Sequence, residues 1–252
     1  MDPTVIERIK RFPKGVAHRG FHDLERPENS KAAFIHAIEC GYPFEFDIHL
    51  TKDGKLLVCH DSDLNRVCGK PGVIEELTLE EIQRDYKLFD GSAPIDLEEL
   101  LSLNPGKVPM VIELKAKNGN EDALVEAAAP LLEKIQNPDD CVLISFSAEA
   151  LREAKKRHVP LPLGFLVGTE AVKHVPEKDL YEFDFLDVEV HYSLLPRFGR
   201  YRKKGGVILC WTVKGPLTYF IGKHRCDGTT WEIVDSAKDK LKVNRFLAKR
   251  YC

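Results

Sequence analysis

The sequence has no hydrophobic stretch that approaches the length of a membrane-spanning helix. Charged residues make up 31% of its 252 residues and are spread along the whole chain. A transmembrane helix needs about 20 consecutive apolar residues. The first 15 residues also carry charges where a signal peptide would need an apolar centre. We therefore expect no transmembrane segment.

The seven cysteines form no C-x-x-C pair, the spacing typical of redox and zinc sites. Their odd number and their apolar surroundings do not suggest the disulfide framework of a secreted protein. Histidine-rich ligand spacings are absent too, which disfavours a zinc hydrolase. Reduced thiols and a cytoplasmic location are the simplest expectation.

An excess of positive charge is also missing. The chain has 37 Lys and Arg against 40 Asp and Glu, a net charge of -3. Nucleic-acid binding needs a basic surface, so we expect no nucleic-acid partner. Internal repeats are absent as well. We predict one domain over residues 1–252, since barrel enzymes often use about 250 residues as a single unit.

Short apolar runs alternate with amphipathic segments along the chain. The apolar runs are Gly15–Arg19, Phe44–Leu50, Val108–Leu114, Cys141–Ser145, Pro162–Leu166, Phe185–Val190, Val207–Thr212 and Gly228–Ile233. The segments with the apolar spacing of a helix are Thr4–Phe12, Ser30–Cys40, Glu121–Gln136, Ala148–Arg157 and Ser236–Lys249. Such alternation predicts parallel strands joined by helices. Eight strands favour a (β/α)8 TIM barrel, with the first helix beneath it. A doubly wound open sheet is the alternative that counting strands leaves open.

A turn signal follows the second run. Asp53-Gly54 separates it from the strand-like segment Leu56–His60, and Asp-Gly between two such segments is typical of a two-residue hairpin turn. We therefore predict that Leu56–His60 runs antiparallel to the second strand. Residues 61–107 are then predicted to form a small insertion after that strand.

Two acidic side chains share one face of the second strand. Glu45 and Asp47 are two residues apart, so they project the same way. Buried together they would repel each other unless a cation lay between them, although an edge strand with solvated acids is the alternative. If Lys52 pairs with Lys55 across a two-residue turn, Asp47 faces His60. That register would make His60 a candidate proton carrier. A β-bulge in the hairpin would shift the register and turn His60 away from Asp47.

Other strand ends carry charged groups as well. Glu113 and Lys115 end the third run, and His18 and Arg19 end the first. Because the C-terminal ends of barrel strands form the functional rim, we expect these side chains to meet Glu45, Asp47 and His60 there. Three carboxylates suit Mg²⁺ or Ca²⁺, and also Mn²⁺, better than zinc. The cationic side chains fit a substrate that contains a phosphodiester.

Seven segments occur in a characteristic order: Val16-Ala17-His18-Arg19-Gly20, Pro27-Glu28-Asn29-Ser30, Glu45-Phe46-Asp47, Thr51-Lys52-Asp53-Gly54, His60-Asp61, Glu113-Leu114-Lys115 and Trp211-Thr212-Val213. Their order and approximate spacing resemble the glycerophosphodiester phosphodiesterase family. The resemblance implies hydrolysis of a small-molecule glycerophosphodiester to glycerol 3-phosphate and an alcohol.

The resemblance also implies a role for each residue of the predicted rim. Glu45, Asp47 and Glu113 would hold one divalent cation, Arg19 and Lys115 would bind the phosphate, and His18 and His60 would be general base and acid, provisionally in that order. The glycerol 2-hydroxyl of the substrate would attack phosphorus first and give a cyclic phosphate that water opens.

The end of the last strand departs from the family. Relatives usually have an Ile-Thr-Asp-like segment followed by Pro, whereas this chain has Thr230-Trp231-Glu232. We expect Trp231, with Trp211 and Phe146, to line the substrate pocket. Lys214 stands where the family often has Asn, and we interpret it as a solvated loop lysine rather than an added phosphate contact.

Two alternative functions fit the same motifs. One is a lysophospholipase D or sphingomyelinase-like enzyme on the same barrel, which would need an apolar rim; the polar insertion favours a water-soluble substrate instead. The other is a non-catalytic phosphodiester-binding protein, which would be expected to lose a histidine or a metal carboxylate. The sequence leaves the alcohol, the cation and the oligomeric state open.

Overall fold

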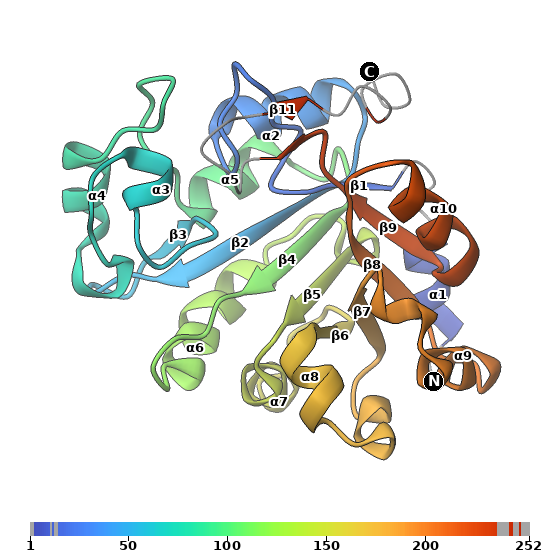
Figure 1. Cartoon of the computed structure of the whole chain (residues 1–252). Helices are drawn as coiled ribbons and strands as arrows, with labels where there is room; N and C mark the ends of the chain where they lie inside the picture. Colours follow the sequence, from blue (N-terminus) through green and yellow to red (C-terminus); the bar gives the residue numbers. More distant parts are fainter. Residues whose placement is uncertain (1–2, 11, 13–14, 236–241, 244–246, 248–252) are drawn as a thin grey trace.

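Eight parallel strands close into a barrel, with helices around its outside (Figure 1). The computed structural model describes residues 3–10, 12, 15–235, 242–243 and 247. The barrel strands are β1 (Val16–Ala17), β2 (Phe44–Leu50), β4 (Met110–Leu114), β5 (Cys141–Ser145), β6 (Leu163–Val167), β7 (Phe185–Glu189), β8 (Ile208–Val213) and β9 (Gly228–Trp231). β1 pairs with both β9 and β2, which closes the ring. The predicted barrel is therefore confirmed, and the open sheet is excluded.

Helices connect the strands on the outside of the barrel. They are α2 (Lys31–Glu39), α6 (Glu121–Leu132), α7 (Ala148–Lys156), α8 (Thr169–His174), α9 (Pro196–Lys203) and α10 (Pro216–Arg225), with 3-10 turns η2 (Pro138–Asp140), η3 (Glu177–Tyr181) and η4 (Tyr192–Leu194). The first three match the predicted helices within a few terminal residues. In the described ranges, no helix combines the length and apolar character that crossing a bilayer requires.

The predicted final helix, Ser236–Lys249, lies largely outside the described residues. Three of its residues are described. Leu247 is helical, whereas β11 (Lys242–Val243) is a short strand antiparallel to β10 (Val234–Asp235). For those two residues the prediction is wrong. Val243 pairs with Val234. Valine is β-branched and therefore favours strands, whereas the prediction of a helix used only the spacing of the apolar residues.

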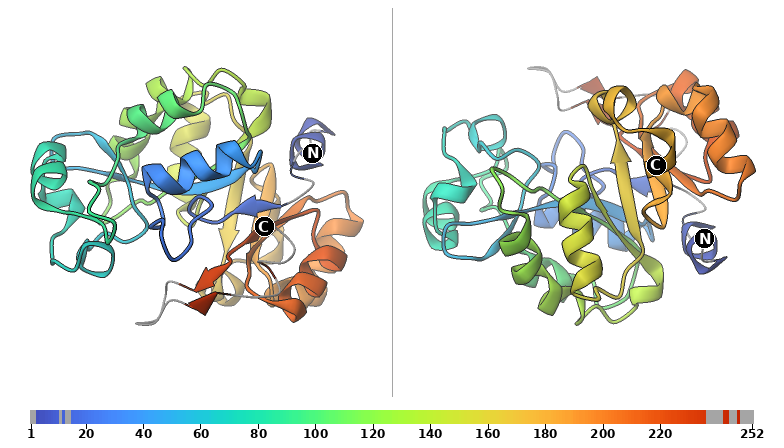
Figure 2. Two further views of the ribbon diagram at one scale, coloured as in Figure 1. Left: turned by 90° about the horizontal axis from the view of Figure 1, so that it is seen from above. Right: turned by 90° about the horizontal axis from the view of Figure 1, so that it is seen from below.

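The N-terminal helix α1 (Pro3–Lys10) covers the bottom of the barrel, as predicted. Its Val5 and Ile9, followed by Phe12, join a buried cluster formed by apolar strand residues. The strand residues of this cluster are Val16, Val111, Val142, Ile144, Leu166, Phe185, Val207 and Leu209. Both views in Figure 2 show α1 and the insertion on opposite sides of the molecule. Because the bottom of the barrel is apolar, the polar groups that could carry chemistry lie at its other end.

The segment between β2 and β4 projects from the barrel beyond the C-terminal end of β2 (Figure 1). Its elements are β3 (Leu56–Val58), α3 (Asn65–Cys68), η1 (Ile74–Glu76), α4 (Leu79–Asp85) and α5 (Leu97–Leu103). It has a small buried cluster of its own, made of Leu57, Cys59, Leu64, Ile74, Ile82 and Tyr86. The position of the predicted insertion is confirmed, whereas one domain for the whole chain stays a prediction.

β3 runs antiparallel to β2, as predicted, but the predicted register is wrong by one residue. Ile48 pairs with Val58, and the Cys59 backbone N–H donates to the Asp47 carbonyl at 3.1 Å. Asp47 therefore faces Cys59 rather than His60. The histidine lies one residue beyond, where the chain has already left the strand.

The length of the hairpin loop explains the different register. Thr51 is the last paired residue on the β2 side of the hairpin, because its backbone N–H donates to the Lys55 carbonyl at 2.8 Å. The Thr51 hydroxyl accepts from the Lys55 backbone N–H at 2.9 Å. Three residues, 52–54, therefore form the loop, and Gly54 adopts the positive φ of 74° that such a loop needs at its end.

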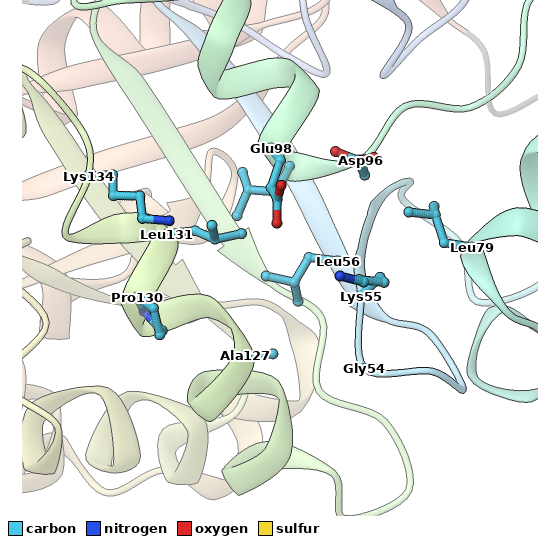
Figure 3. Close-up of a pocket in the computed structure, with 11 residues that line it drawn as sticks. Gly54, Lys55, Leu56, Leu79, Asp96, Glu98, Ala127, Pro130, Leu131 and Lys134 are labelled. Atoms are coloured by element: carbon cyan, nitrogen blue, oxygen red, sulfur yellow. The ribbon is translucent and has the colours of Figure 1, made fainter.

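A hollow of about 360 Å³ lies outside the barrel, between the β2–β3 hairpin, α5 and α6. Figure 3 shows Leu56 and Leu131 pointing toward one another across it, with Lys134 at the edge. No histidine lines it. Its Asp96 is engaged as the N-cap of α5, where it accepts from the Glu99 backbone N–H. This hollow therefore lacks the groups expected of the functional site.

Candidate active site

A cavity of about 450 Å³ opens at the C-terminal mouth of the barrel. It is lined by His18, Arg19, Glu45, His60, Glu113, Lys115, Ile144, Phe146, Leu166, Asp187, Trp211, Thr212, Lys214 and Thr230. Most of these residues lie at or just beyond the C-terminal end of a strand, where barrel enzymes place their chemistry. Most of the predicted site residues thus meet around one cavity.

Three buried carboxylates meet at this mouth. Glu45 and Asp47 come from the inward face of β2, and Glu113 comes from β4, where it stands in register with Asp47. One carboxylate oxygen of each lies within 4.8 Å of those of the other two. Residues two apart on one strand and a residue directly beside them on its parallel neighbour produce this arrangement.

The electrostatics of this group fit a bound cation. Burial raises the pKa of Glu45 well above its ordinary value, and the charges of Asp47 and Glu113 add to the effect. Burial likewise raises the pKa of Glu113 to about 7, against the opposing charge of Lys115. The Lys115 Nζ lies 3.1 Å from Asp47 Oδ1 and 2.8 Å from Glu113 Oε1. Although burial would raise it, the charges of Lys115, His60 and Arg19 lower the pKa of Asp47. Two acids that burial disfavours as anions, beside one that stays ionised, are suited to a hard divalent cation.

The loop after β1 supports both the acids and the guanidinium of Arg19. The backbone N–H of Arg19 donates to Glu45 Oε2 at 2.9 Å, and Asn29 Nδ2 donates to Asp47 Oδ2 at 2.9 Å. The Arg19 Nη1 donates to Glu28 Oε1 at 2.8 Å. Glu28 thus orients the guanidinium at the edge of the cavity.

His18 lies between two acidic side chains. Its Nε2 is 3.9 Å from Glu45 Oε2, and its Nδ1 is 3.4 Å from Glu232 Oε2. Burial lowers the pKa of His18 to about 4; Arg19 acts in the same direction, and Glu232 opposes it. The imidazole is therefore neutral near neutral pH and able to accept a proton.

His60 reaches the cavity from the bend after β3 rather than from a paired strand position. His49 Nε2 lies 3.1 Å from the His60 carbonyl oxygen and fixes this bend. The His60 Nδ1 lies 2.6 Å from Asp61 Oδ1. Because an ionised carboxylate only accepts hydrogen bonds, Nδ1 carries the proton and Nε2 is left for the site. Burial lowers the pKa of His60, and the charges of Asp47 and Asp61 oppose that shift.

An arginine of the insertion, which the sequence did not single out, links these groups. Arg66 donates to both carboxylate oxygens of Glu28, at 2.7 and 2.8 Å, and its Nε donates to Asp61. Glu28 contacts Arg19, and Asp61 contacts His60. One guanidinium therefore supports the two acids that contact Arg19 and His60.

Two of the three predicted aromatic lining residues are in place. Phe146 and Trp211 line the cavity and form an edge-to-face pair with ring centroids 5.6 Å apart. Trp231 does not, so that expectation is wrong. Its ring packs against Phe21 at 5.2 Å, outside the barrel. Successive strand residues face opposite sides, and on β9 it is Thr230 that faces inward.

Lys214 is an exposed loop lysine, as interpreted, but it also pairs with a buried acid. Its Nζ lies 2.9 Å from the buried Glu232 Oε2, and it lines the cavity. Glu232, which the sequence analysis noted only as a departure from the family, thus contacts both His18 and Lys214. The position of Glu232 two residues after Thr230 on an alternating strand was the signal that could have revealed it.

Comparison with known proteins identifies the family. The model of the glycerophosphoryl diester phosphodiesterase family matches residues 18–234. The chain belongs to this family. A glycerophosphodiester phosphodiesterase of Caldanaerobacter subterraneus subsp. tengcongensis is 33% identical over 218 residues, which cover 79% of this chain and 84% of the relative. The predicted resemblance is confirmed, and the protein is a phosphodiesterase of this family.

Solved structures of this phosphodiesterase family share the fold. The glycerophosphodiester phosphodiesterase of Thermotoga maritima is 26% identical, with a TM-score of 0.70 over 86% of this chain and 92% of that one. A phosphodiesterase of Oleispira antarctica in complex with the product sn-glycerol-3-phosphate is 20% identical, with a TM-score of 0.79 over 89% and 94%. The barrel fold of this chain is therefore the fold of these phosphodiesterases.

Proposed function

We propose that this phosphodiesterase hydrolyses glycerophosphodiesters to glycerol 3-phosphate and an alcohol, with one divalent cation bound by Glu45, Asp47 and Glu113. The observation that carries the proposal is the meeting of these carboxylates with two imidazoles at the mouth of one cavity. Mg²⁺ and Ca²⁺, and also Mn²⁺, suit such a set of oxygen ligands.

The positive side chains would bind the phosphodiester. Arg19 presents a guanidinium that can grip phosphoryl oxygens, and the Lys115 ammonium lies at the cavity wall. A divalent cation held by the acids would supply further positive charge that stabilises the charge building on those oxygens. Together these groups favour the transition state over the bound substrate.

The histidines would carry the protons. The neutral His18 would accept the proton of the glycerol 2-hydroxyl as that oxygen attacks phosphorus. His60 in its imidazolium form, whose Nδ1–H is held by Asp61, would give its Nε2 proton to the alcohol oxygen as that oxygen's bond to phosphorus breaks. Water would then open the cyclic phosphate, with the direction of both proton transfers reversed. Each transfer of this kind contributes roughly 10² to 10⁴ in rate.

One observation favours a second candidate, the hydrolysis of lysophospholipids. Leu194, Leu217 and Phe220 are exposed on η4 and α10, the elements that follow β7 and β8 at the C-terminal rim. Large exposed apolar side chains that gather near a site indicate contact with apolar ligands or surfaces. An acyl chain could lie there.

The two candidates differ in their products. We expect release of glycerol 3-phosphate from glycerophosphocholine, glycerophosphoethanolamine or glycerophosphoglycerol, measured with a coupled enzymatic assay in the presence of each cation. Lysophosphatidylcholine is the parallel substrate. Preferential formation of lysophosphatidic acid would support the second candidate, and no hydrolysis of any diester would point to a non-catalytic binding protein.

The cysteines support the proposed cytoplasmic location. All six that lie in the described part of the chain are free thiols. Free, mostly buried cysteines are typical of proteins from reducing compartments.

Replacing Arg66 by Ala is expected to lower kcat about 10- to 100-fold, because two supporting acids lose their shared partner and such outer contacts are typically worth that much. Steady-state kinetics with glycerophosphocholine tests this. Arg84→Ala is the matched control, since Arg84 also lies in the insertion and pairs with its neighbour Asp85. Equal kinetics for the two variants would remove Arg66 from the supporting network.

A further inference from the structure

Positive charge is concentrated in the C-terminal part of the chain. Residues 190–252 contain 14 Lys and Arg against 4 Asp and Glu, whereas residues 1–189 contain 23 against 36. No acidic residue lies between Glu189 and Asp227, where the chain has eight Lys and Arg. This acid-free segment forms η4, α9, β8 and α10, and its two helices lie on the side of the barrel opposite the insertion (Figure 2). One side of a negatively charged protein is therefore basic.

Half of these eight cations have partners on the protein itself. Arg200, Arg202 and Lys214 form ion pairs with acidic side chains, and another arginine donates to two backbone carbonyl groups of α8 and its C-terminal cap. The other four are exposed and form no ion pair within the described residues: Lys203, Lys204, Lys223 and Arg225. Cations without an acidic partner leave a positive field that attracts an external anion.

Large apolar side chains are exposed on the same segment. Leu217 and Phe220 of α10 are 66% and 61% exposed, and Leu194 and Leu195, at the end of η4, are 48% and 36% exposed. Only three other side chains of this kind are exposed in the part of the chain that the structure describes. Because η4 packs against α10, the four side chains lie on neighbouring elements. Exposed apolar side chains that gather in this way mark an interaction surface, whereas scattered ones do not.

The exposed side of α10 combines apolar and cationic groups. Leu217, Phe220 and Lys223 follow one another at intervals of three residues, so they lie on the same side of the helix. The ring of His224 packs on that of Phe220, with centroids 4.4 Å apart, while Ile221 is buried on the opposite side. Helices that present apolar side chains beside cations are typical of proteins that bind at the membrane interface.

We propose that this surface, the η4–α10 face made of Leu194, Leu195, Leu217, Phe220 and Lys223, docks on an anionic lipid bilayer. The apolar side chains enter the boundary between the headgroups and the acyl chains, and the ammonium group contacts lipid phosphates. The other unpaired cations of α9 and α10 attract the bilayer over about one Debye length. Docking goes beyond the proposed function, because it requires no turnover.

The composition of the η4–α10 face selects a bilayer among the possible partners. A second copy of the chain would bring two basic surfaces together, and these repel each other. A nucleic acid offers phosphates but leaves the leucine side chains against a polar backbone. An anionic bilayer supplies a negative surface and an apolar layer directly beneath it.

Docking through this face places the active site beside the lipid headgroups. Lys214 lines the cavity and lies two residues before the first residue of α10. The turn η4 follows β7 at the same C-terminal rim. The mouth of the barrel and the η4–α10 face are therefore adjacent, and the bound protein works close to the bilayer surface.

Co-sedimentation of the whole protein with vesicles tests the proposal. The vesicles consist of phosphatidylcholine alone, or of phosphatidylcholine and phosphatidylglycerol in equal parts. We expect the protein to bind the anionic vesicles at least about tenfold more tightly than the neutral ones at low ionic strength, because several unpaired cations contribute. Added salt should weaken this binding, since it screens the charges.

Two variants separate the apolar contribution from the charged one. Phe220→Ser should weaken binding to anionic vesicles about tenfold, the worth of one buried aromatic side chain. Lys223→Gln should weaken it about fivefold and change binding to neutral vesicles less than about twofold. Phe89→Ser and Lys87→Gln are the matched controls, because both residues are exposed on the insertion, across the barrel from α10. Circular dichroism checks that each variant is folded.

Several results would overturn the proposal. These are no sedimentation with either kind of vesicle, equal binding to both kinds, or equal losses in the variants and their controls. Without vesicle binding, an RNA homopolymer, a dimer in analytical ultracentrifugation or monomeric lysophosphatidylcholine whose binding is lost in Phe220→Ser would assign the face to that partner instead. A protein that binds anionic vesicles but cleaves no diester would refute the proposed function and leave the docking surface standing.

Discussion

Removal of divalent cations is expected to reduce the hydrolysis of glycerophosphodiesters by roughly 10³-fold, since a catalytic cation supplies several kcal/mol of charge stabilisation. The physical reason lies in the three buried carboxylates, whose oxygens approach within 4.8 Å. Lys115 lies between only two of them, Asp47 and Glu113. The measurement is the initial rate with a chelator, and again after Mg²⁺, Ca²⁺ or Mn²⁺ is added back.

A variant of Glu45, one of the three proposed metal ligands, tests the same site. Glu45→Gln keeps the shape of the side chain but removes its negative charge, so calorimetric titration should show cation affinity lowered at least about 10-fold. Glu170→Gln is the control, because Glu170 is an exposed acid that pairs with Lys173 on α8. A chelator without effect on the rate, or equal cation affinity in both variants, would contradict the metal site.

Replacement of His60 by Ala is expected to lower kcat by about 10³-fold while cation binding stays almost intact. The imidazole is oriented by Asp61 and lines the cavity, but it is not one of the three oxygen ligands. The kinetic measurement uses saturating glycerophosphocholine, and calorimetry follows the cation. His174→Ala serves as the control, because His174 is an exposed histidine at the end of α8.

The two measurements together separate proton transfer from metal binding. A loss of both activity and cation affinity in His60→Ala would assign the residue to the metal site instead. Unchanged turnover would remove it from the mechanism. Substrates with a more acidic leaving alcohol need less protonation, so they should be less sensitive to the substitution.

Local signals in the sequence were enough to predict the barrel. Strand residues that are buried on both faces form short apolar runs, and the helices between them keep an apolar stripe. The acids of β2 were predictable for the same reason, since Glu45 and Asp47 interrupt such a run at alternating positions. The place of Glu113 beside Asp47 followed from the shared C-terminal rim and was found in register.

What the sequence could not show depends on contacts between distant segments. Asp53-Gly54 indicates a reversal of the chain. The Thr51 hydroxyl accepts a hydrogen bond from the Lys55 backbone N–H, and the loop is therefore one residue longer than the predicted two-residue turn. Arg66 and Glu28 are 38 residues apart and meet only because the insertion brings Arg66 beside the loop that follows β1. Single charged residues in polar segments carry no local sign of such a partner.

The helix beneath the barrel also constrains how the products leave. Val5, Ile9 and Phe12 fill the lower end together with apolar strand residues, so in the described part of the chain the reacting groups open toward solvent only at the mouth. Substrate arrival and product departure then share one passage. On the proposed function, the alcohol and glycerol 3-phosphate would both leave through this mouth. An accumulated phosphomonoester would therefore block the next diester, and the reaction should slow as its own product builds up.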